Sequence, residues 1–363
     1  MDADTRERLA REIEFHDLTV DDLEEISGLI TGMSRDGESL RLRDKSAAYY
    51  RWMYFENPAG QAFGCLARHE GRVVCSFAVA PKAMQVDGRR VLLGKTMDMF
   101  THPDYQGLGL MGRCADQVFA RAREGGLEGW YVTPSVNSYP IFKRWGYRED
   151  FVLHFRARPL DVAATVASVR PRAGRWASAA SRAVAPLARL LDRTPRLPAG
   201  WSVAEEDTFG PEVDDLWRRV GGGYRVAIVR DAGYLRWRYS DNPDDYAVLA
   251  LRRDGVLRGL AVLKVTVRHG LAVGEVVDVV APARDARTWG LLLRHAVDVL
   301  RRRGCAVVEA WAIRGTWVDR RLIRSGLAIP RATLPFLLSP DLGEPAVHDP
   351  EAWLLSQGDG NDV

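Results

Sequence analysis

The chain has 363 residues, enough for about two domains, and its 47% hydrophobic, 27% charged and 9% aromatic residues are typical of a folded globular protein. Its 51 basic and 48 acidic residues leave a net charge of +3, which is too small for the basic surface of a nucleic-acid-binding protein. The composition therefore excludes wholesale disorder and predicts no nucleic-acid partner.

The cysteines and the N-terminal residues bear on metal binding and location. Four cysteines, Cys65, Cys75, Cys114 and Cys305, have neither zinc-site nor paired spacing, so we expect no metal and no disulfide. Residues 1–14 are charged and lack an apolar run, and no stretch reaches about 18 apolar residues, so we expect neither secretion nor a membrane span. The sequence predicts a cytoplasmic protein.

An internal repeat organises the chain. Residues 51–58, Arg-Trp-Met-Tyr-Phe-Glu-Asn-Pro, recur 185 residues later at 236–243 as Arg-Trp-Arg-Tyr-Ser-Asp-Asn-Pro. Asp98 matches Asp278, 180 residues later. Matches that keep their order while the offset shrinks slowly indicate two copies of one domain with small deletions in loops.

Both copies predict the same elements in the same order. A helix (20–31; 211–220) precedes the repeated segment; then come three strands (62–69, 73–79, 91–101; 246–253, 257–265, 274–281), a long helix (108–124; 288–303), a buried strand (129–133; 306–312), a short helix and a last strand (151–156; 332–338). Alternating strands and helices with antiparallel hairpins predict a mixed α/β sheet with helices on both faces.

These elements give domains at 12–158 and 200–340, an Ala- and Arg-rich helical linker at 159–199 and an acidic tail at 341–363. Residues 170–196 hold seven arginines with apolar residues at helical spacing. Packing on one of the domains is the favoured interpretation, and association with a membrane surface is the alternative. The tail is rich in Gly, Pro and Asp, so we expect it to be loosely held.

Residues 96–113 predict a strand, a Gly-rich turn and a helix. Gly107, Gly109 and Gly112 would let an anion such as a pyrophosphate approach the amides at the helix N-terminus closely. A plain strand-to-helix turn explains such a segment equally well. The loop acquires meaning only from the elements around it.

Two motifs carry a resemblance to a known family. Residues 106–111, Gln-Gly-Leu-Gly-Leu-Met, resemble the acetyl-CoA signature of the GNAT (GCN5-related N-acetyltransferase) family, although Met111 stands where Gly or Ala is usual. Residues 137–147 resemble the helix and Gly-aromatic ending of the family's motif B. The tandem arrangement is similar to acetyltransferases of the enhanced intracellular survival type, without their sterol-carrier-like domain. In the second copy residues 283–291 lack the closely spaced glycines, so one active site is expected.

The resemblance implies acetyl-CoA as co-substrate and implies which residues hold it. Backbone groups of the strand would hold the pantetheine arm and acyl carbonyl, loop amides the pyrophosphate, and the start of motif B the pantetheine end. The residues so implied are Met99, Phe100, Thr101, Gln106, Gly107, Leu108, Gly109, Leu110, Met111, Gly112, Asn137 and Ser138.

Direct attack by an amine needs a group that accepts its proton and one that protonates the leaving thiolate. The usual tyrosine of motif B aligns with Phe142, so Tyr139, one turn earlier, is the candidate donor. Asp98, an acid inside an apolar strand, is the candidate base. Because Asp278 repeats it in the copy without the loop, a structural bond to the repeated segment explains Asp98 as well.

The sequence thus predicts a GNAT-type N-acetyltransferase that acetylates an amine of a small polar acceptor, such as an amino sugar or aminoglycoside-like metabolite. The alternatives are a protein or peptide lysine acetyltransferase and a CoA-binding sensor or scaffold without catalysis, which the missing tyrosine at Phe142 favours. The acceptor's identity, the acyl chain length and the formation of a homo-oligomer stay open.

Overall fold

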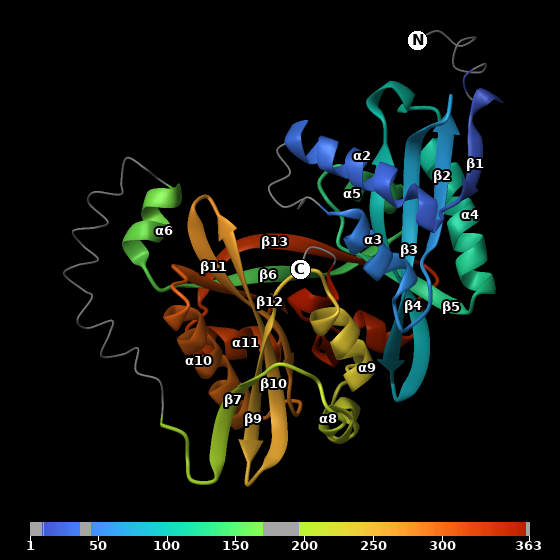
Figure 1. The fold of residues 1–363 in the computed structure, drawn as a ribbon. Helices are drawn as coiled ribbons and strands as arrows, with labels where there is room; N and C mark the ends of the chain where they lie inside the picture. Colours follow the sequence, from blue (N-terminus) through green and yellow to red (C-terminus); the bar gives the residue numbers. More distant parts are fainter. Residues whose placement is uncertain (1–8, 10, 37–44, 170–195, 361–363) are drawn as a thin grey trace.

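The structure is a computed structural model, and it describes residues 9, 11–36, 45–169 and 196–360 (Figure 1). The first copy consists of β1 (Glu14–Asp17), α2 (Leu23–Asp36), α3 (Ala47–Phe55), β2 (Phe63–His69), β3 (Arg72–Val86), β4 (Arg89–Thr101), α4 (Leu110–Glu124), β5 (Leu127–Val132), α5 (Tyr139–Arg144) and β6 (Arg148–Pro159). α6 (Val162–Val169) follows it.

The second copy repeats this order. It consists of β7 (Trp201–Glu206), α8 (Glu212–Val220), β8 (Val226–Ile228), α9 (Ala232–Leu235), a π-helical turn (Arg236–Ser240), β9 (Ala247–Arg253), β10 (Val256–Arg268), β11 (Leu271–Val280), α10 (Ala286–Arg302), β12 (Val307–Ile313), α11 (Trp317–Arg324) and β13 (Ile329–Leu338). β14 (Trp353–Leu354) and a 3₁₀ turn (Gln357–Asp359) follow. The predicted mixed α/β sheet is confirmed.

The two copies share one sheet because they exchange their last strands. The sheet order is β1-β2-β3-β4-β5-β13-β6-β12-β11-β10-β9-β7. β13 of the second copy pairs with β5 of the first, and β6 of the first copy pairs with β12 of the second, both antiparallel. Tyr131, Phe336 and Phe151 stack across this exchange, with ring centroids 5.3 Å apart at each step. The exchange fixes the first copy's site strands against the second copy.

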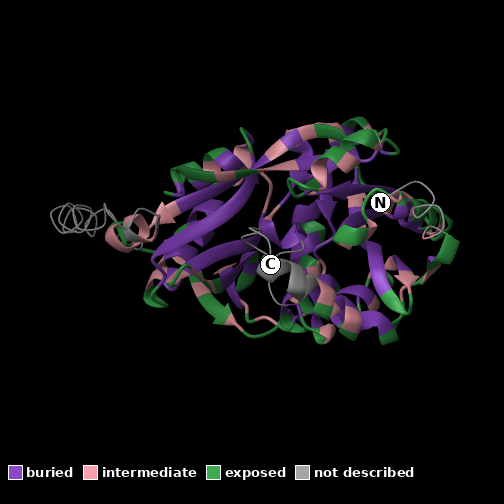
Figure 2. Cartoon of the chain, turned by 90° about the horizontal axis from the view of Figure 1, so that it is seen from above, coloured by how far each residue is buried: buried purple, intermediate pink, exposed green. Residues whose placement is uncertain are grey.

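Each face of the sheet in the first copy has its own apolar layer. Side chains of α4 pack on one face, against Phe77 and Val79 of β3, while α3 covers the other face and joins the core shared by both copies. Figure 2 shows the buried residues along the strands and the exposed ones on the outer helices and turns. None of the helices within the described ranges is long and apolar enough to cross a membrane.

The repeated segments meet at a region that we call the seam, defined by Trp52 and Trp237. Their rings stack with centroids 4.9 Å apart. Each indole Nε1 donates to the other residue's backbone carbonyl, over 2.7 Å from Trp52 and 3.2 Å from Trp237. The seam therefore joins equivalent residues of the two copies by equivalent contacts.

The prediction of a loosely held tail is wrong for residues 341–360. Leu342, Val347 and Trp353 are buried, and β14 pairs with β8. Asp359 is buried and pairs with Arg230, Nη2 to Oδ2 over 2.8 Å. Apolar side chains between the acidic ones hold the segment in the core. The predicted amphipathic segment 170–196 falls almost wholly outside the described residues.

Candidate functional site

The Gly-rich loop leaves β4 at Thr101 and enters α4 at Leu110. Gly107 (φ 82°) and Gly109 (φ 73°) both have left-handed backbone, which glycine adopts without strain, and Gly109 is the N-cap of α4. A Cβ placed at Gly107, Gly109 or Gly112 would meet no atom within 4 Å. The first four amides of a helix have no partner within it. The loop therefore presents helix-terminal amides to open space, as an anion cradle requires.

The equivalent helix of the second copy is capped by the chain itself. Asp285, the N-cap of α10, accepts hydrogen bonds from the amides of Arg287 (2.9 Å) and Thr288 (3.2 Å) through its carboxylate. That carboxylate occupies the place an anionic ligand would need. The structure thus gives a physical reason why one copy offers an anion site and the other does not.

Next to the cradle, β4 and β5 separate. Their parallel pairing runs from Leu92–Leu127 to Lys95–Tyr131 and ends there, although β4 continues to Thr101. Phe100 and Thr101 pair with β3 on the opposite edge. The edge of β4 that faces β5 can therefore hydrogen-bond an extended ligand, as a sheet edge binds an added strand. Met99, Phe100 and Thr101 lie on this stretch, as predicted for the pantetheine arm.

The other predicted cofactor residues surround the same opening. Asn137 is exposed and Ser138 is half-buried, in the turn between β5 and α5. Ser138 Oγ lies 3.1 Å from Ser135 Oγ. Gln106 is exposed and its Nε2 donates to the carbonyl of Thr101 over 3.4 Å. Leu108, Leu110 and Met111 pack their side chains against the α4 face of the core.

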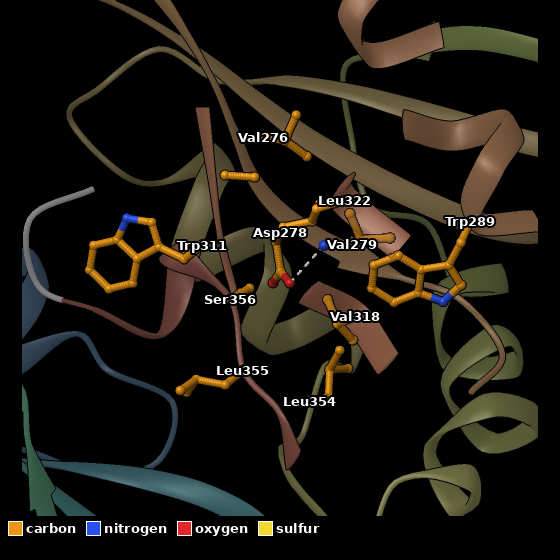
Figure 3. Close-up of a pocket in the computed structure, with 11 residues that line it drawn as sticks. Val276, Asp278, Val279, Trp289, Trp311, Val318, Leu322, Leu354, Leu355 and Ser356 are labelled. Atoms are coloured by element: carbon orange, nitrogen blue, oxygen red, sulfur yellow. Dashed lines mark hydrogen bonds between the residues drawn. The ribbon is translucent and has the colours of Figure 1, made fainter. Parts of the chain in front are cut away.

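In the second copy the corresponding opening is filled. β11 and β12 pair from Val273–Val307 to Val276–Ala310 and then separate. The C-terminal segment lies against this opening, and a small cavity remains, lined by Val276, Asp278, Val279, Trp289, Ala310, Trp311, Val318, Leu322, Leu354, Leu355 and Ser356 (Figure 3). This cavity is the second copy's counterpart of the β4–β5 opening, and the chain's own C-terminal segment forms one wall of it.

Asp98 sits at a bulge of β4, with φ at 50°. Its carboxylate accepts a hydrogen bond from Tyr54 Oη (2.7 Å) and pairs with Lys45 Nζ (3.4 Å). Ser76 Oγ donates to the Asp98 carbonyl over 3.1 Å. The structural bond to the repeated segment that the sequence analysis left open is therefore present, through Tyr54.

The second copy contains the same arrangement. Asp278 accepts from Tyr239 Oη (3.0 Å) and pairs with Arg230 Nε (3.0 Å). Tyr239 and Arg230 each stand 185 residues after their counterparts, Tyr54 and Lys45. The sequence analysis missed Lys45 and Arg230, although a basic residue repeated at the offset of the main repeat was a usable signal.

Tyr139 begins α5 and its hydroxyl donates to Glu149 Oε2 over 2.5 Å. This hydrogen bond, with a smaller effect of desolvation, raises the pKa of Tyr139, so the hydroxyl keeps its proton at neutral pH. Phe142 is fully buried among apolar side chains. Of the two motif B positions, only Tyr139 offers a proton.

Residues 35–149 match the acetyltransferase (GNAT) domain, a match that includes the cradle, the β4–β5 opening and motif B. The chain has the GNAT fold, in two copies. The predicted class, GNAT-type N-acetyltransferase, is confirmed at the level of the family. No curated protein matches the chain in sequence.

Solved structures share the tandem GNAT arrangement at low sequence identity. A tandem GNAT protein from the clavulanic acid biosynthesis pathway is 16% identical, with 92% of this chain and 100% of that chain covered at a TM-score of 0.60. Saccharomyces cerevisiae N-myristoyltransferase with bound myristoyl-CoA is 11% identical, with 90% and 82% covered at 0.63. A probable N-acyltransferase from Enterococcus faecalis V583 is 11% identical, with 90% and 72% covered at 0.60. These likenesses establish the fold.

Proposed function

We propose that the protein is an acyl-CoA-dependent N-acyltransferase that transfers an acetyl group to an amine of a small polar acceptor, with its one active site in the domain at 12–158. The observation that carries this proposal is the difference between the two helix N-termini. Gly109 leaves the amides of α4 to a ligand, whereas Asp285 caps those of α10. Within the tandem GNAT proteins, the motif residues favour the enhanced intracellular survival type.

The residues around the loop fit the two halves of acetyl-CoA. The amides of residues 107–112 would hold the pyrophosphate, since no Cβ of the glycines blocks the approach. The free edge of β4 at Met99 to Thr101 would hold the pantetheine arm, with Asn137 and Ser138 at its end. When bound, acetyl-CoA supplies the activated acyl group, and the protein supplies orientation and proton transfer.

The residues at the opening divide the chemical work. A backbone amide near Met99 or Phe100 would stabilise the negative charge that develops on the acyl oxygen. Asp98 would accept the proton of the attacking amine, and Tyr139 would donate a proton to the departing sulfur. The raised pKa of Tyr139 keeps that proton available at neutral pH.

Tyr139→Phe is expected to lower kcat/KM about 100-fold without changing the affinity for acetyl-CoA, because only proton donation is lost. Steady-state kinetics and calorimetry measure the two quantities. Tyr246→Phe, which removes a hydroxyl of the second copy, is the matched control and should leave both unchanged. Equal kcat/KM for Tyr139→Phe and the unmodified protein would remove Tyr139 from the mechanism.

Asp98→Asn tests the base against its purely structural alternative. The two copies hold Asp98 and Asp278 in the same way, so Asp278→Asn reproduces the structural change away from the active site. We expect kcat/KM to fall about 100-fold in Asp98→Asn and to stay unchanged in Asp278→Asn. If Asp98→Asn loses stability but keeps kcat/KM, the residue only supports the bulge of β4.

The acceptor is identified by an amine screen. Thiol release from acetyl-CoA is followed with amino sugars, aminoglycosides, lysine peptides and proteins, and the products are weighed by mass spectrometry. The proposal expects acetylation of a small amine. Acetylation of lysine side chains alone would favour the protein acetyltransferase, and binding of acetyl-CoA without release for any acceptor would favour the sensor, the function that a buried Phe142 in place of tyrosine supports.

A further inference from the structure

Most buried cations of the described chain have a carboxylate partner. Arg230 pairs with Asp278 and Asp359, Arg156 with Asp319, and Lys264 with Asp244. This is the expected arrangement, because a buried charge without a partner costs several kcal/mol. Two buried cations at the seam, Arg238 and Lys82, depart from it.

Arg238 is 0% exposed, and no carboxylate among the described residues lies within ion-pair distance of its guanidinium. Its Nε and Nη2 donate to the carbonyls of Gly358 (2.9 Å) and Gly360 (3.0 Å). Its Nη1 has no hydrogen-bond acceptor within the described part of the chain. The repeat marks this residue as a departure, because the first copy has Met53 at the matching position.

Lys82 is 4% exposed and reaches the same place from β3. Its Nζ lies 4.8 Å from the ring centroid of Trp237, while the Arg238 guanidinium lies 5.5 Å from the ring of Trp52. Burial lowers the pKa of Lys82 to about 7; the charges of Arg238 and Lys95 lower it further and Asp359 opposes them. Asp359 is already engaged by Arg230. The seam thus carries more positive charge than its own acids neutralise.

Two tyrosine hydroxyls complete the set. Tyr234 packs its ring against Trp237, with centroids 5.7 Å apart, and Tyr131 lies at the end of β5. Both hydroxyls are buried and, within the described residues, have no hydrogen-bond partner. Burial raises the pKa of both tyrosines, and the charges of Arg230 and Arg238 act on both. They therefore remain protonated donors.

We propose that the seam is a binding site for the carboxylate of a small organic acid, held by Arg238, Lys82, Tyr131 and Tyr234. All four side chains have hydrogen atoms to donate. An ionised carboxylate is acceptor-only, with two oxygens and about four lone-pair positions, and it neutralises the charge of a buried guanidinium. This site is separate from the acyl-CoA cradle and does not depend on acyl transfer.

The five lysines of the chain make the test direct, because side-chain nitrogen resonances of lysine can be followed individually by NMR. The signal of Lys82 is assigned by its absence in Lys82→Arg. In the presence of acetate, lactate or glutamate, at constant ionic strength, we expect the pKa of Lys82 to rise from about 7 toward the ordinary lysine value of 10.5. Chloride and acetamide, a neutral analogue of acetate, should leave it unchanged.

Two variants and one further anion complete the experiment. Arg238→Met, which installs the residue of the first copy, should abolish the response, and Arg238→Lys should retain part of it. The carboxylates should also raise the melting temperature of the unmodified protein but not of Arg238→Met. If no carboxylate changes the pKa of Lys82 or the melting temperature, water alone fills the seam and the proposal is wrong. An equal response to sulfate would also overturn it, because the site would then not select carboxylates.

Discussion

Gly109→Asp is expected to weaken acetyl-CoA binding at least about 100-fold, or about 2.7 kcal/mol. The new carboxylate would stand at the N-cap of α4, where it would repel the pyrophosphate and accept hydrogen bonds from the amides that the ligand needs, as Asp285 does in the second copy. Titration calorimetry measures the loss.

The control must carry the same backbone strain without the charge at the cradle. Gly304 has a left-handed φ of 77°, close to the 73° of Gly109, and a Cβ there also meets no atom within 4 Å. Gly304→Asp, at the end of α10, should cost a similar stability of about 1–2 kcal/mol and leave acetyl-CoA binding intact. Unaltered binding by Gly109→Asp would show that the loop of the first copy is a plain turn.

Asp359→Asn is expected to lower the free energy of unfolding by about 3 kcal/mol, because it leaves the fully buried guanidinium of Arg230 with Asp278 alone. Urea unfolding measures the change. The prediction follows from the packing of the C-terminal segment against the second copy, with Arg238 holding the carbonyls of Gly358 and Gly360.

An exposed ion pair provides the comparison for this variant. Asp87 pairs with Arg225, Oδ1 to Nε over 2.7 Å, and the two side chains are 43% and 54% exposed. Asp87→Asn should therefore change the free energy of unfolding by less than about 1 kcal/mol. Equal small losses in the two variants would mean that the C-terminal segment contributes little to the fold.

The order of the elements could be predicted because each strand and helix carries its own hydrophobic pattern. The pattern failed to give the length of β3, which was predicted to end at residue 79 and runs to Val86. Pro81 explains the difference. β2 pairs with β3 up to Val79 and β8 pairs from Met84, so the missing amide of Pro81 falls where that edge has no strand partner.

The exchange of the last strands could not be predicted from local patterns. β6 and β13 have the alternation of ordinary strands, and nothing within 151–156 or 332–338 specifies a partner in the other copy. The C-terminal segment was missed for a different reason. Its Gly, Pro and Asp content indicates a loop, whereas Trp353 and Leu354 bury their side chains and Asp359 finds a buried partner.

At the candidate site, the sequence was informative where function depends on the backbone. Gly107 and Gly109 have the left-handed φ that the loop requires, so the glycine spacing alone located the cradle. It was silent where function depends on distant side chains. Lys45 and Tyr54 reach Asp98 from α3 and the turn before it, and no local pattern indicates that contact.

The central claim is that one copy binds the acyl donor and the other does not. Titration of the unmodified protein with acetyl-CoA by calorimetry tests it most directly. We predict one molecule bound per chain, at the N-terminus of α4. Two molecules per chain, or none, would contradict the assignment of a single acyl-CoA site to the first copy.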